Sequence, residues 1–167
     1  DDMDARTIDI ATMPRGGPTA SCLDRALQTD RLEYLDRDSD LPADLARKRS
    51  VIRALERTGE LFGNHEKFAH IALDEVADVP DPRIVELGAG HGGLSAKLLE
   101  AHPTARLTIT DVEADSVAAI AAGELGAHPR VTVREVDATS IDAPDDAFDL
   151  AVFALALHHL PPSAAVR

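Results

Sequence analysis

Cysteine and long apolar runs are scarce in this sequence. Its single cysteine, Cys22, excludes a disulfide within the chain and a zinc cluster built from cysteines. No apolar run approaches the roughly 20 residues needed to cross a bilayer, so we expect no membrane-spanning segment. The first residues, DDMDARTIDIATMP, are acidic and have no apolar stretch after a basic start, which predicts that a secretory signal is absent. These absences together predict a cytoplasmic protein.

Positive charge is also scarce. The sequence has 17 lysines and arginines against 30 aspartates and glutamates, for a net charge of −13. A protein that follows a phosphate backbone needs clustered basic residues, and here they are scattered among the acids. Nucleic acid is therefore not expected as the main partner, whereas small molecules and protein partners stay open. With 44% apolar residues the chain can bury a core, and no internal repeat divides it.

The first half of the sequence carries helical patterns. Residues 1–20 contain prolines and glycines and little periodic apolar content, which indicates an arm or loop. Apolar residues then recur at helical spacing as far as Pro80. Helices are expected over residues 22–35, over residues 43–61, and from a cap at Asn64 to just before Pro80. We therefore interpret residues 21–80 as a helical cap or lid.

From residue 81 onward, short apolar runs alternate with amphipathic segments. Strands are expected over residues 84–87, 107–110, 131–136 and 148–155, with helices over residues 94–101 and 116–125. This alternation is typical of an α/β, doubly wound, Rossmann-like parallel sheet, so residues 81–167 are predicted to form one nucleotide-binding domain. The chain stops at Arg167, soon after a strand that would leave an apolar sheet edge exposed. We therefore expect that further C-terminal strands are missing from this sequence.

The most informative pattern is a glycine cluster in residues 84–94, IVELGAGHGGL, between a strand and a helix. Glycines at such a turn permit positive φ and let a ligand approach the backbone, and the helix start offers free N–H groups. The spacing of Gly88, Gly90 and Gly93 fits the dinucleotide fingerprint G-x-G-x-x-G. The same cluster, taken from Glu86, fits E-x-G-x-G-x-G. The carboxylate favours the second pattern, because dinucleotide enzymes usually have an apolar residue at this place.

Two acidic strand ends and a fourth strand follow the glycine cluster. Asp111 ends the strand LTITD, Asp137 ends the next strand, and Phe148 begins the run FDLAVFALALHHL. With these motifs in this order, the sequence from Arg83 to about Pro162 resembles the class I S-adenosylmethionine-dependent methyltransferase superfamily. The pattern E-x-G-x-G-x-G is the first motif of that superfamily.

The resemblance implies S-adenosylmethionine (SAM) as the cofactor and assigns its contacts. It implies that Glu86 lies near the cationic methionine end, that Asp111 accepts the two ribose hydroxyls and that Asp137 accepts the adenine amino group. The backbone N–H of Ala138 would face the adenine ring. The full set of cofactor-binding residues that it implies is Glu86, Gly88, Ala89, Gly90, Asp111, Val112, Asp137, Ala138 and Phe153. Asp149 is expected to be structural and close to the glycine turn.

The implied function is methyl transfer to an O, N or C atom of a small-molecule acceptor. Such transfer depends mainly on positioning, and a hydroxyl acceptor also needs a base. His158 and His159, just past the fourth strand, are candidates for that base or for lining the pocket. Two alternatives stay open: an NAD(P)-dependent oxidoreductase that uses the same glycine turn, and a binding module that has a methyltransferase fold and no activity.

Other histidines lie inside the glycine turn or before it. His91 is inside the turn, where it is expected to contact the cofactor region or solvent. His65 and His70 do not have the i, i+4 spacing that places two ligands on one helical face, so no metal site is expected. The segment Phe62–Phe68 precedes the first strand, and we expect it to fold over the cofactor as a lid that presents Asn64 or His65.

Overall fold

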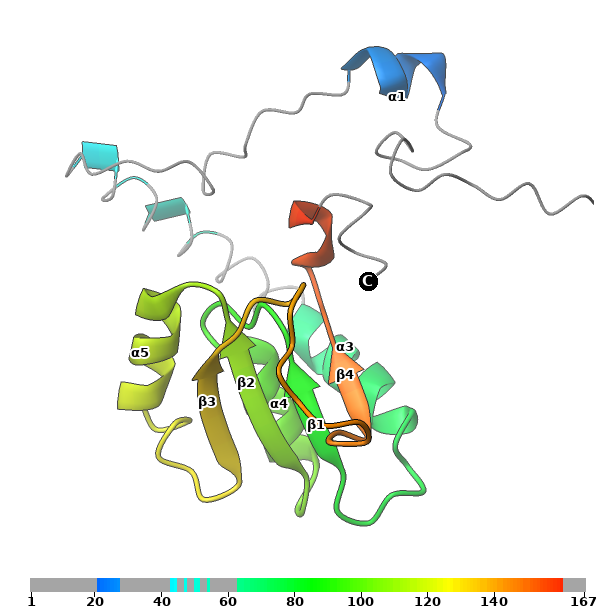
Figure 1. Ribbon diagram of the computed structural model, residues 1–167, viewed down its shortest axis with the longest axis vertical. Helices are drawn as coiled ribbons and strands as arrows, with labels where there is room; N and C mark the ends of the chain where they lie inside the picture. Colours follow the sequence, from blue (N-terminus) through cyan, green and yellow to red (C-terminus); the bar gives the residue numbers. More distant parts are fainter. Residues whose placement is uncertain are drawn as a thin grey trace, which may run out of the picture. The chain divides into compact units, whose positions relative to one another are not determined.

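The computed structural model describes residues 21–27, 43–44, 47, 50–51, 54 and 63–160. The chain divides into two compact units, residues 1–51 with 158–167, and residues 52–157. The first unit contains helix α1 (Cys22–Leu27), which carries the exposed Cys22, and short helical pieces between residues 43 and 51 (Figure 1). These pieces fall within the two helices predicted before residue 62. The remainder of those helices and the predicted arm, residues 1–20, lie outside the described residues.

The second unit is built on a parallel sheet. β1 (Arg83–Glu86) pairs with β2 (Arg106–Asp111), β2 pairs with β3 (Val131–Glu135), and β4 (Leu150–Val152) pairs with the other side of β1. The resulting 4-stranded sheet has the order β3-β2-β1-β4 (Figure 1), which confirms the predicted Rossmann-like α/β fold. The strand order reverses between β1 and β4. In open sheets of this kind, ligands bind at such a point, outside the carboxyl ends of the strands.

β4 is shorter than the strand predicted over residues 148–155. It ends at Val152, and Leu155 has a φ of 62°. This left-handed backbone conformation does not fit an extended strand and is rare for a bulky residue. The chain therefore leaves the sheet soon after β4, and the side chains of Phe153 and Ala156 come to lie against Gly88.

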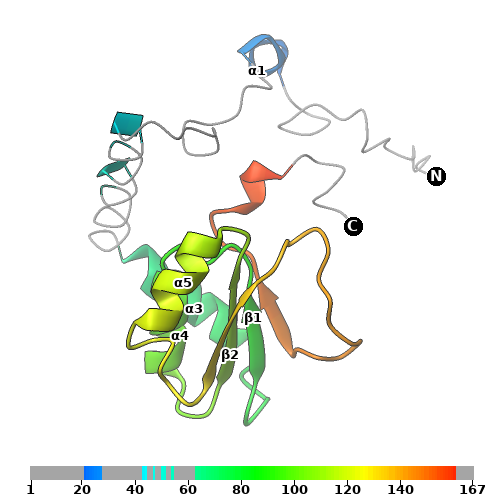
Figure 2. The same cartoon turned by 60° about the vertical axis from the view of Figure 1, so that its left-hand side comes forward.

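Helices cover one face of the sheet. They are α3 (Asn64–Asp74), α4 (Gly93–Ala101) and α5 (Ala114–Ala122), and residues 136–149 cross the opposite face (Figures 1 and 2). Ile84, Leu98 and Ile109 are fully buried between the helices and the strands. Within the described ranges, no helix is long and apolar enough to cross a membrane.

The start of α3 differs from the prediction. Asn64 is the first residue of the helix rather than its cap, because Gly63 holds the cap position with a φ of 60°. A left-handed φ of this kind carries a steric cost for any residue with a Cβ, and glycine avoids it. Glu66 lies in the first turn, as predicted, and its carboxylate pairs with Lys97 of α4 at 3.3 Å.

Asp149 joins the start of β4 to the start of β1. Its Oδ2 accepts hydrogen bonds from the Arg83 backbone N–H at 2.7 Å and from Arg83 Nε at 3.1 Å, and its Oδ1 accepts one from Arg83 Nη2 at 2.9 Å. The Asp149 N–H donates to the Arg83 carbonyl at 2.8 Å. Asp149 is therefore structural, as predicted. The predicted place near the glycine turn is wrong, because parallel strands all start at one edge and the turn lies at the other.

We expect Asp149→Asn to lower the unfolding temperature, because the amide replaces an acceptor oxygen by a donor and cannot keep all of the bonds to Arg83. Hydrogen bonding to Arg83 lowers the pKa of Asp149 to about 2. The ionised carboxylate therefore stabilises the fold above its ordinary pKa of 3.8, and this contribution is lost as the pH falls through about 2. Thermal unfolding followed by circular dichroism should show a clear loss at neutral pH and a smaller one at about pH 2.

Asp145→Asn is the matched control for this experiment, since Asp145 is an exposed aspartate in the same connecting segment. It should leave the unfolding temperature nearly unchanged at either pH. Equal losses for the two variants would contradict a specific role of the Arg83–Asp149 pair.

Candidate functional site

The turn after β1, residues 87–92, is bonded to both neighbouring strands at their carboxyl ends. The Leu87 N–H donates to the Val152 carbonyl of β4 at 2.8 Å, and the Ala89 N–H donates to the Thr110 carbonyl of β2 at 2.9 Å. Within the turn, the Gly92 N–H donates to the Ala89 carbonyl at 2.9 Å. These bonds fix the shape of the turn at the point where the strand order reverses.

The glycines of the turn have different reasons for lacking a side chain. Gly88, Gly90 and Gly92 have positive φ values of 64°, 56° and 77°. A methyl group added at Gly88 would lie 2.8 Å from the Ala156 Cβ, and one at Gly92 would lie 2.7 Å from Leu125 Cδ2. At Gly90 the added group would meet no atom within 4 Å. Gly88 and Gly92 therefore allow close protein packing, whereas the backbone of Gly90 borders open space.

Asp111, at the end of β2, faces this turn. It is only 7% exposed, and its Oδ2 accepts the Gly90 N–H at 2.7 Å while its Oδ1 accepts the Glu113 N–H at 2.9 Å. An ionised carboxylate has about four acceptor sites, so two are still available for a ligand. The structure thus brings the predicted ribose-binding carboxylate and the glycine turn together.

Glu86, at the end of β1, is 5% exposed. Its Oε2 accepts a hydrogen bond from the hydroxyl of Ser95, on the first turns of α4. Burial, with a smaller contribution from the nearby carboxylate of Asp111, raises the pKa of Glu86 from 4.5 to about 7, against the opposing effect of hydrogen bonds from Ser95. Glu86 is thus a buried acid close to the turn and to Asp111, and its predicted role toward the methionine end stays a prediction.

Two hydroxyl groups that the sequence patterns did not single out are bonded to this acidic strand end. Ser95 is fully buried, and Thr110 Oγ1 donates to the Glu86 carbonyl at 2.8 Å. A signal for Ser95 was present, because it stands with Leu94 and Leu98 on the buried side of α4. A hydroxyl on the buried side of a helix needs a hydrogen-bond partner within the protein. Glu86 is the acidic residue of β1, the strand that precedes α4.

Asp137 is exposed just past β3, in a segment anchored to the end of β2, where the Val136 N–H donates to the Asp111 carbonyl at 3.0 Å. Its Oδ1 accepts hydrogen bonds from the Thr139 hydroxyl at 2.7 Å and the Thr139 N–H at 2.8 Å, which lower the pKa of Asp137. The two acidic strand ends are therefore neighbours at one edge of the sheet. Asp137 is therefore ionised near neutral pH. The two hydrogen bonds from Thr139 to its Oδ1 fix the orientation of the carboxylate.

The remaining predicted cofactor contacts are apolar. Val112, directly after Asp111, is 60% exposed. Ala138 is half-buried beside Asp137. The ring of Phe153 lies at the glycine turn, since its Cε2 would be 3.0 Å from a Cβ added at Gly88.

The predicted catalytic histidines do not belong to the compact unit that contains the glycine turn. His158 and His159 lie in the short 3-10 turn Leu157–His159, which follows β4 along the chain. Both belong to the other compact unit, and the side chain of His158 is outside the described residues, so their role stays a prediction. His91 is exposed within the glycine turn. Over the described ranges, no group of three or more histidine, cysteine, aspartate and glutamate side chains is arranged to hold a metal ion.

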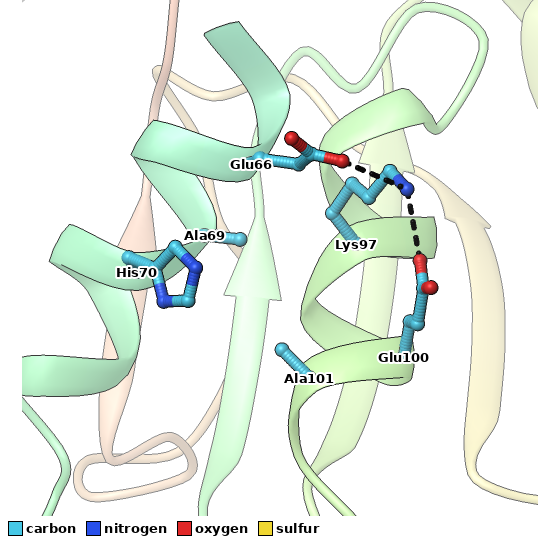
Figure 3. A pocket seen from close by; sticks show the side chains of 6 residues that line it. All are labelled: Glu66, Ala69, His70, Lys97, Glu100 and Ala101. Atoms are coloured by element: carbon cyan, nitrogen blue, oxygen red, sulfur yellow. Dashed lines mark hydrogen bonds and ion pairs between the residues drawn. The ribbon is translucent and has the colours of Figure 1, made fainter. Parts of the chain in front are cut away.

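A cleft of about 220 Å³ lies between α3 and α4 (Figure 3). Lys97 lies between Glu100 Oε2 at 2.9 Å and Glu66 Oε1 at 3.3 Å, so its charge is already paired. The residues that line the cleft are Glu66, Ala69, His70, Lys97, Glu100 and Ala101. None of them belongs to the glycine turn or to the ends of the strands, so this cleft is not the site described above.

A model of the methyltransferase-domain family matches residues 84–167, which are half of the chain. The match therefore begins at β1 and includes the glycine turn, Asp111, Asp137 and β4. No curated protein matches the chain.

Three of the solved structures that the chain resembles are methyltransferases by name. The plantazolicin methyltransferase BpumL in complex with SAH is 12% identical, with a TM-score of 0.52 over 72% of this chain and 46% of that one. Human N-acetylserotonin methyltransferase in complex with SAM is 21% identical, with a TM-score of 0.50 over 77% of this chain and 36% of that one. A SAM-dependent methyltransferase from Aquifex aeolicus is 20% identical, with a TM-score of 0.45 over 52% of this chain and 47% of that one. The chain spans less than half the length of each of these proteins.

Glu86→Gln is expected to change how stability depends on pH. Because the pKa of Glu86 is raised from 4.5 to about 7, the folded wild-type chain loses stability as the pH rises through this window and the buried carboxyl ionises. Glutamine cannot ionise and still accepts the Ser95 hydroxyl. Each tenfold change in proton affinity is worth about 1.4 kcal/mol, so the variant should gain about 3 kcal/mol relative to wild type between pH 4.5 and pH 8.

Urea unfolding at a series of pH values measures this difference. Glu124→Gln, at an exposed glutamate in the loop after α5, is the control and should follow the wild-type pH profile. If the free energy of unfolding of Glu86→Gln depends on pH in the same way as that of wild type, Glu86 is not a buried acid with a raised pKa.

Proposed function

The chain belongs to the methyltransferase-domain family, as its sequence predicted, and from this premise we propose that it binds SAM at the glycine turn and transfers the methyl group to a small-molecule acceptor. The observation that carries the proposal is the open space beside Gly90, bordered by the Asp111 carboxylate. A positive φ, no side chain and no protein atom in the way are the conditions under which a ligand can lie directly on the backbone. The residues present therefore fit a nucleoside ligand at this edge of the sheet.

Asp111 is the proposed acceptor for the ribose hydroxyls. Its bond to the Gly90 N–H turns the carboxylate toward the glycine turn and leaves acceptor sites on both oxygens. A carboxylate can accept two adjacent hydroxyls at once, and the low exposure of Asp111 strengthens such charge-assisted bonds.

Asp137 is the proposed acceptor for the adenine amino group. Thr139 holds Oδ1 with two hydrogen bonds, and Oδ2 accepts none from the described part of the chain. The exposed Val112 and the half-buried Ala138 lie beside the two carboxylates along the chain. They supply the apolar surface on which an adenine ring can rest.

The chain's contribution to methyl transfer is mainly alignment and exclusion of water. SAM, when bound, supplies a methyl group on a sulfonium sulfur that a nucleophile can attack. We propose that the Glu86 carboxyl, buried close to the turn, lies near the methionine end, where a cationic ligand favours its ionised form. His158 or His159 is the proposed base for a hydroxyl acceptor, which is supported by their place in the chain shortly after the carboxyl end of β4.

A small molecule is the proposed acceptor because of the charge of the chain. The net charge of −13 repels a nucleic-acid backbone, whereas neutral or cationic metabolites are not repelled. Incubation of the protein with a methyl-labelled donor and a metabolite extract tests this proposal. Label in a small molecule is expected; label in nucleic acid instead would overturn the choice of acceptor.

Calorimetric titration with SAM, S-adenosylhomocysteine (SAH) and NAD in parallel tests the cofactor. We expect heat from the two sulfur compounds and none from NAD. Tight binding of NAD without a response to SAM or SAH would overturn the proposal in favour of an oxidoreductase.

Asp137→Asn is expected to weaken SAM binding by about tenfold, the effect of losing roughly one hydrogen bond to a charged group. Asparagine Oδ1 keeps both bonds to Thr139, so the amide nitrogen takes the place of Oδ2 and presents a donor to the adenine amino group. The same titration on Asp142→Asn, at an exposed aspartate of the following segment, is the control and should give the wild-type affinity. Unchanged affinity in Asp137→Asn would remove Asp137 from the adenine site.

A further inference from the structure

Gly93, the first residue of α4, has no conformational reason to be glycine. Unlike Gly88, Gly90 and Gly92, it does not have a positive φ. Alanine at a helical position is normally favoured over glycine by about 1 kcal/mol. The reason for glycine here is spatial: a Cβ at this position would lie 2.6 Å from Nδ1 and 3.2 Å from Nε2 of His65. The imidazole of His65 therefore rests directly on the backbone of Gly93.

His65 is the second residue of α3, and this contact is the first of a series between α3 and α4. The Glu66–Lys97 ion pair lies next to it, and Ala69 and Ala72 are buried farther along the helix (Figure 3 shows Glu66, Ala69 and Lys97). Small buried residues let two helices approach closely, so α3 and α4 pack as one layer. The contact of His65 lies at the end of this layer where the glycine turn enters α4.

A shift of Gly93 changes the glycine turn directly. Gly93 follows Gly92, whose N–H is bonded to Ala89 and whose Cα is packed against Leu125. No residue separates Gly93 from the turn, which ends at Gly92. The His65 contact therefore joins α3 to α4 directly beside the turn.

We propose that His65 is a positioning residue for the cofactor turn: its imidazole, seated on Gly93, holds the start of α4 in place and couples α3 to cofactor binding. This inference rests on the proposed function for the part that concerns the cofactor. The packing itself is independent of it. A positioning residue acts by keeping the bound geometry, and displacements of about 1 Å are enough to weaken a site.

The packing is tested by a double-mutant cycle on the unfolding temperature of the cofactor-free chain. In the wild-type background, Gly93→Ala is expected to lower the unfolding temperature, because its Cβ collides with the ring. In the His65→Ala background, the same substitution is expected to raise it, because the space is free and alanine favours the helix. An increase in both backgrounds, or a decrease in both, would overturn the packing.

The coupling is tested by calorimetric titration of each variant with SAH. His65→Ala is expected to weaken binding on the order of tenfold, at the lower end of energetic coupling between sites. His65→Phe keeps a flat ring over Gly93 and should recover affinity to within about twofold. His70→Ala removes an exposed histidine from the next turn of the same helix and should leave affinity unchanged. A purely structural role would lower the unfolding temperature and leave the affinity of the folded His65→Ala chain unchanged, which would overturn the proposal.

The two proposals fail in different ways. If wild type shows no heat with SAM or SAH, the proposed function is wrong, whereas the cycle on the unfolding temperature still decides the His65–Gly93 contact. If wild type binds SAH and His65→Ala binds it equally well, the proposed function stands and the positioning role of His65 is wrong.

Discussion

The hydrogen bond from the Gly90 N–H to the Asp111 carboxylate is the interaction on which the carboxyl edge of the sheet depends. It joins the turn after β1 to the end of β2, and the second carboxylate oxygen fixes Glu113 at the entrance to α5. The buried side chain of Asp111 thus fixes both the turn from β1 to α4 and the start of α5. Charge-assisted bonds of this kind are strong and directional, and they are stronger where water is excluded. Gly90, which donates this bond, has a left-handed backbone conformation and borders the open space.

Burying Asp111 and Glu86 at the same edge is unfavourable for folding, because like charges repel and each loses its hydration. Ser95 and Thr110 compensate in part, through hydrogen bonds to the Glu86 carboxylate and carbonyl. Such arrangements are concentrated at functional sites, where stability is lower than it would be with apolar residues. A cationic ligand would offset the repulsion, which agrees with the proposed sulfonium cofactor.

Much of this site could be predicted from the sequence because it depends on strand ends. The alternation of apolar runs located Glu86, Asp111 and Asp137 at the carboxyl ends of parallel strands, and parallel strands bring such ends together. The position of Asp149 could also have been predicted from the sequence. A residue that precedes a parallel strand must lie at the edge opposite the turn, beside Arg83.

Other features depend on tertiary contacts that no local pattern contains. β4 ends at Val152, and the chain then turns through the left-handed backbone of Leu155. Leucine rarely adopts this conformation, so the sequence did not predict it. The Glu86–Ser95 bond required knowing which side of α4 faces the strand. The glycine at position 93 looked like part of a binding motif, and only the structure shows that it accommodates the ring of His65.

The Arg83–Asp149 pair has a consequence for how this domain can change over time. It lies at the amino edge of the sheet, and the glycine turn and the acidic strand ends lie at the carboxyl edge. Substitutions at the pair are therefore expected to alter thermal robustness without changing the residues at the carboxyl edge. Selection for heat tolerance and selection for a new acceptor can therefore act on separate sets of residues in the same small sheet.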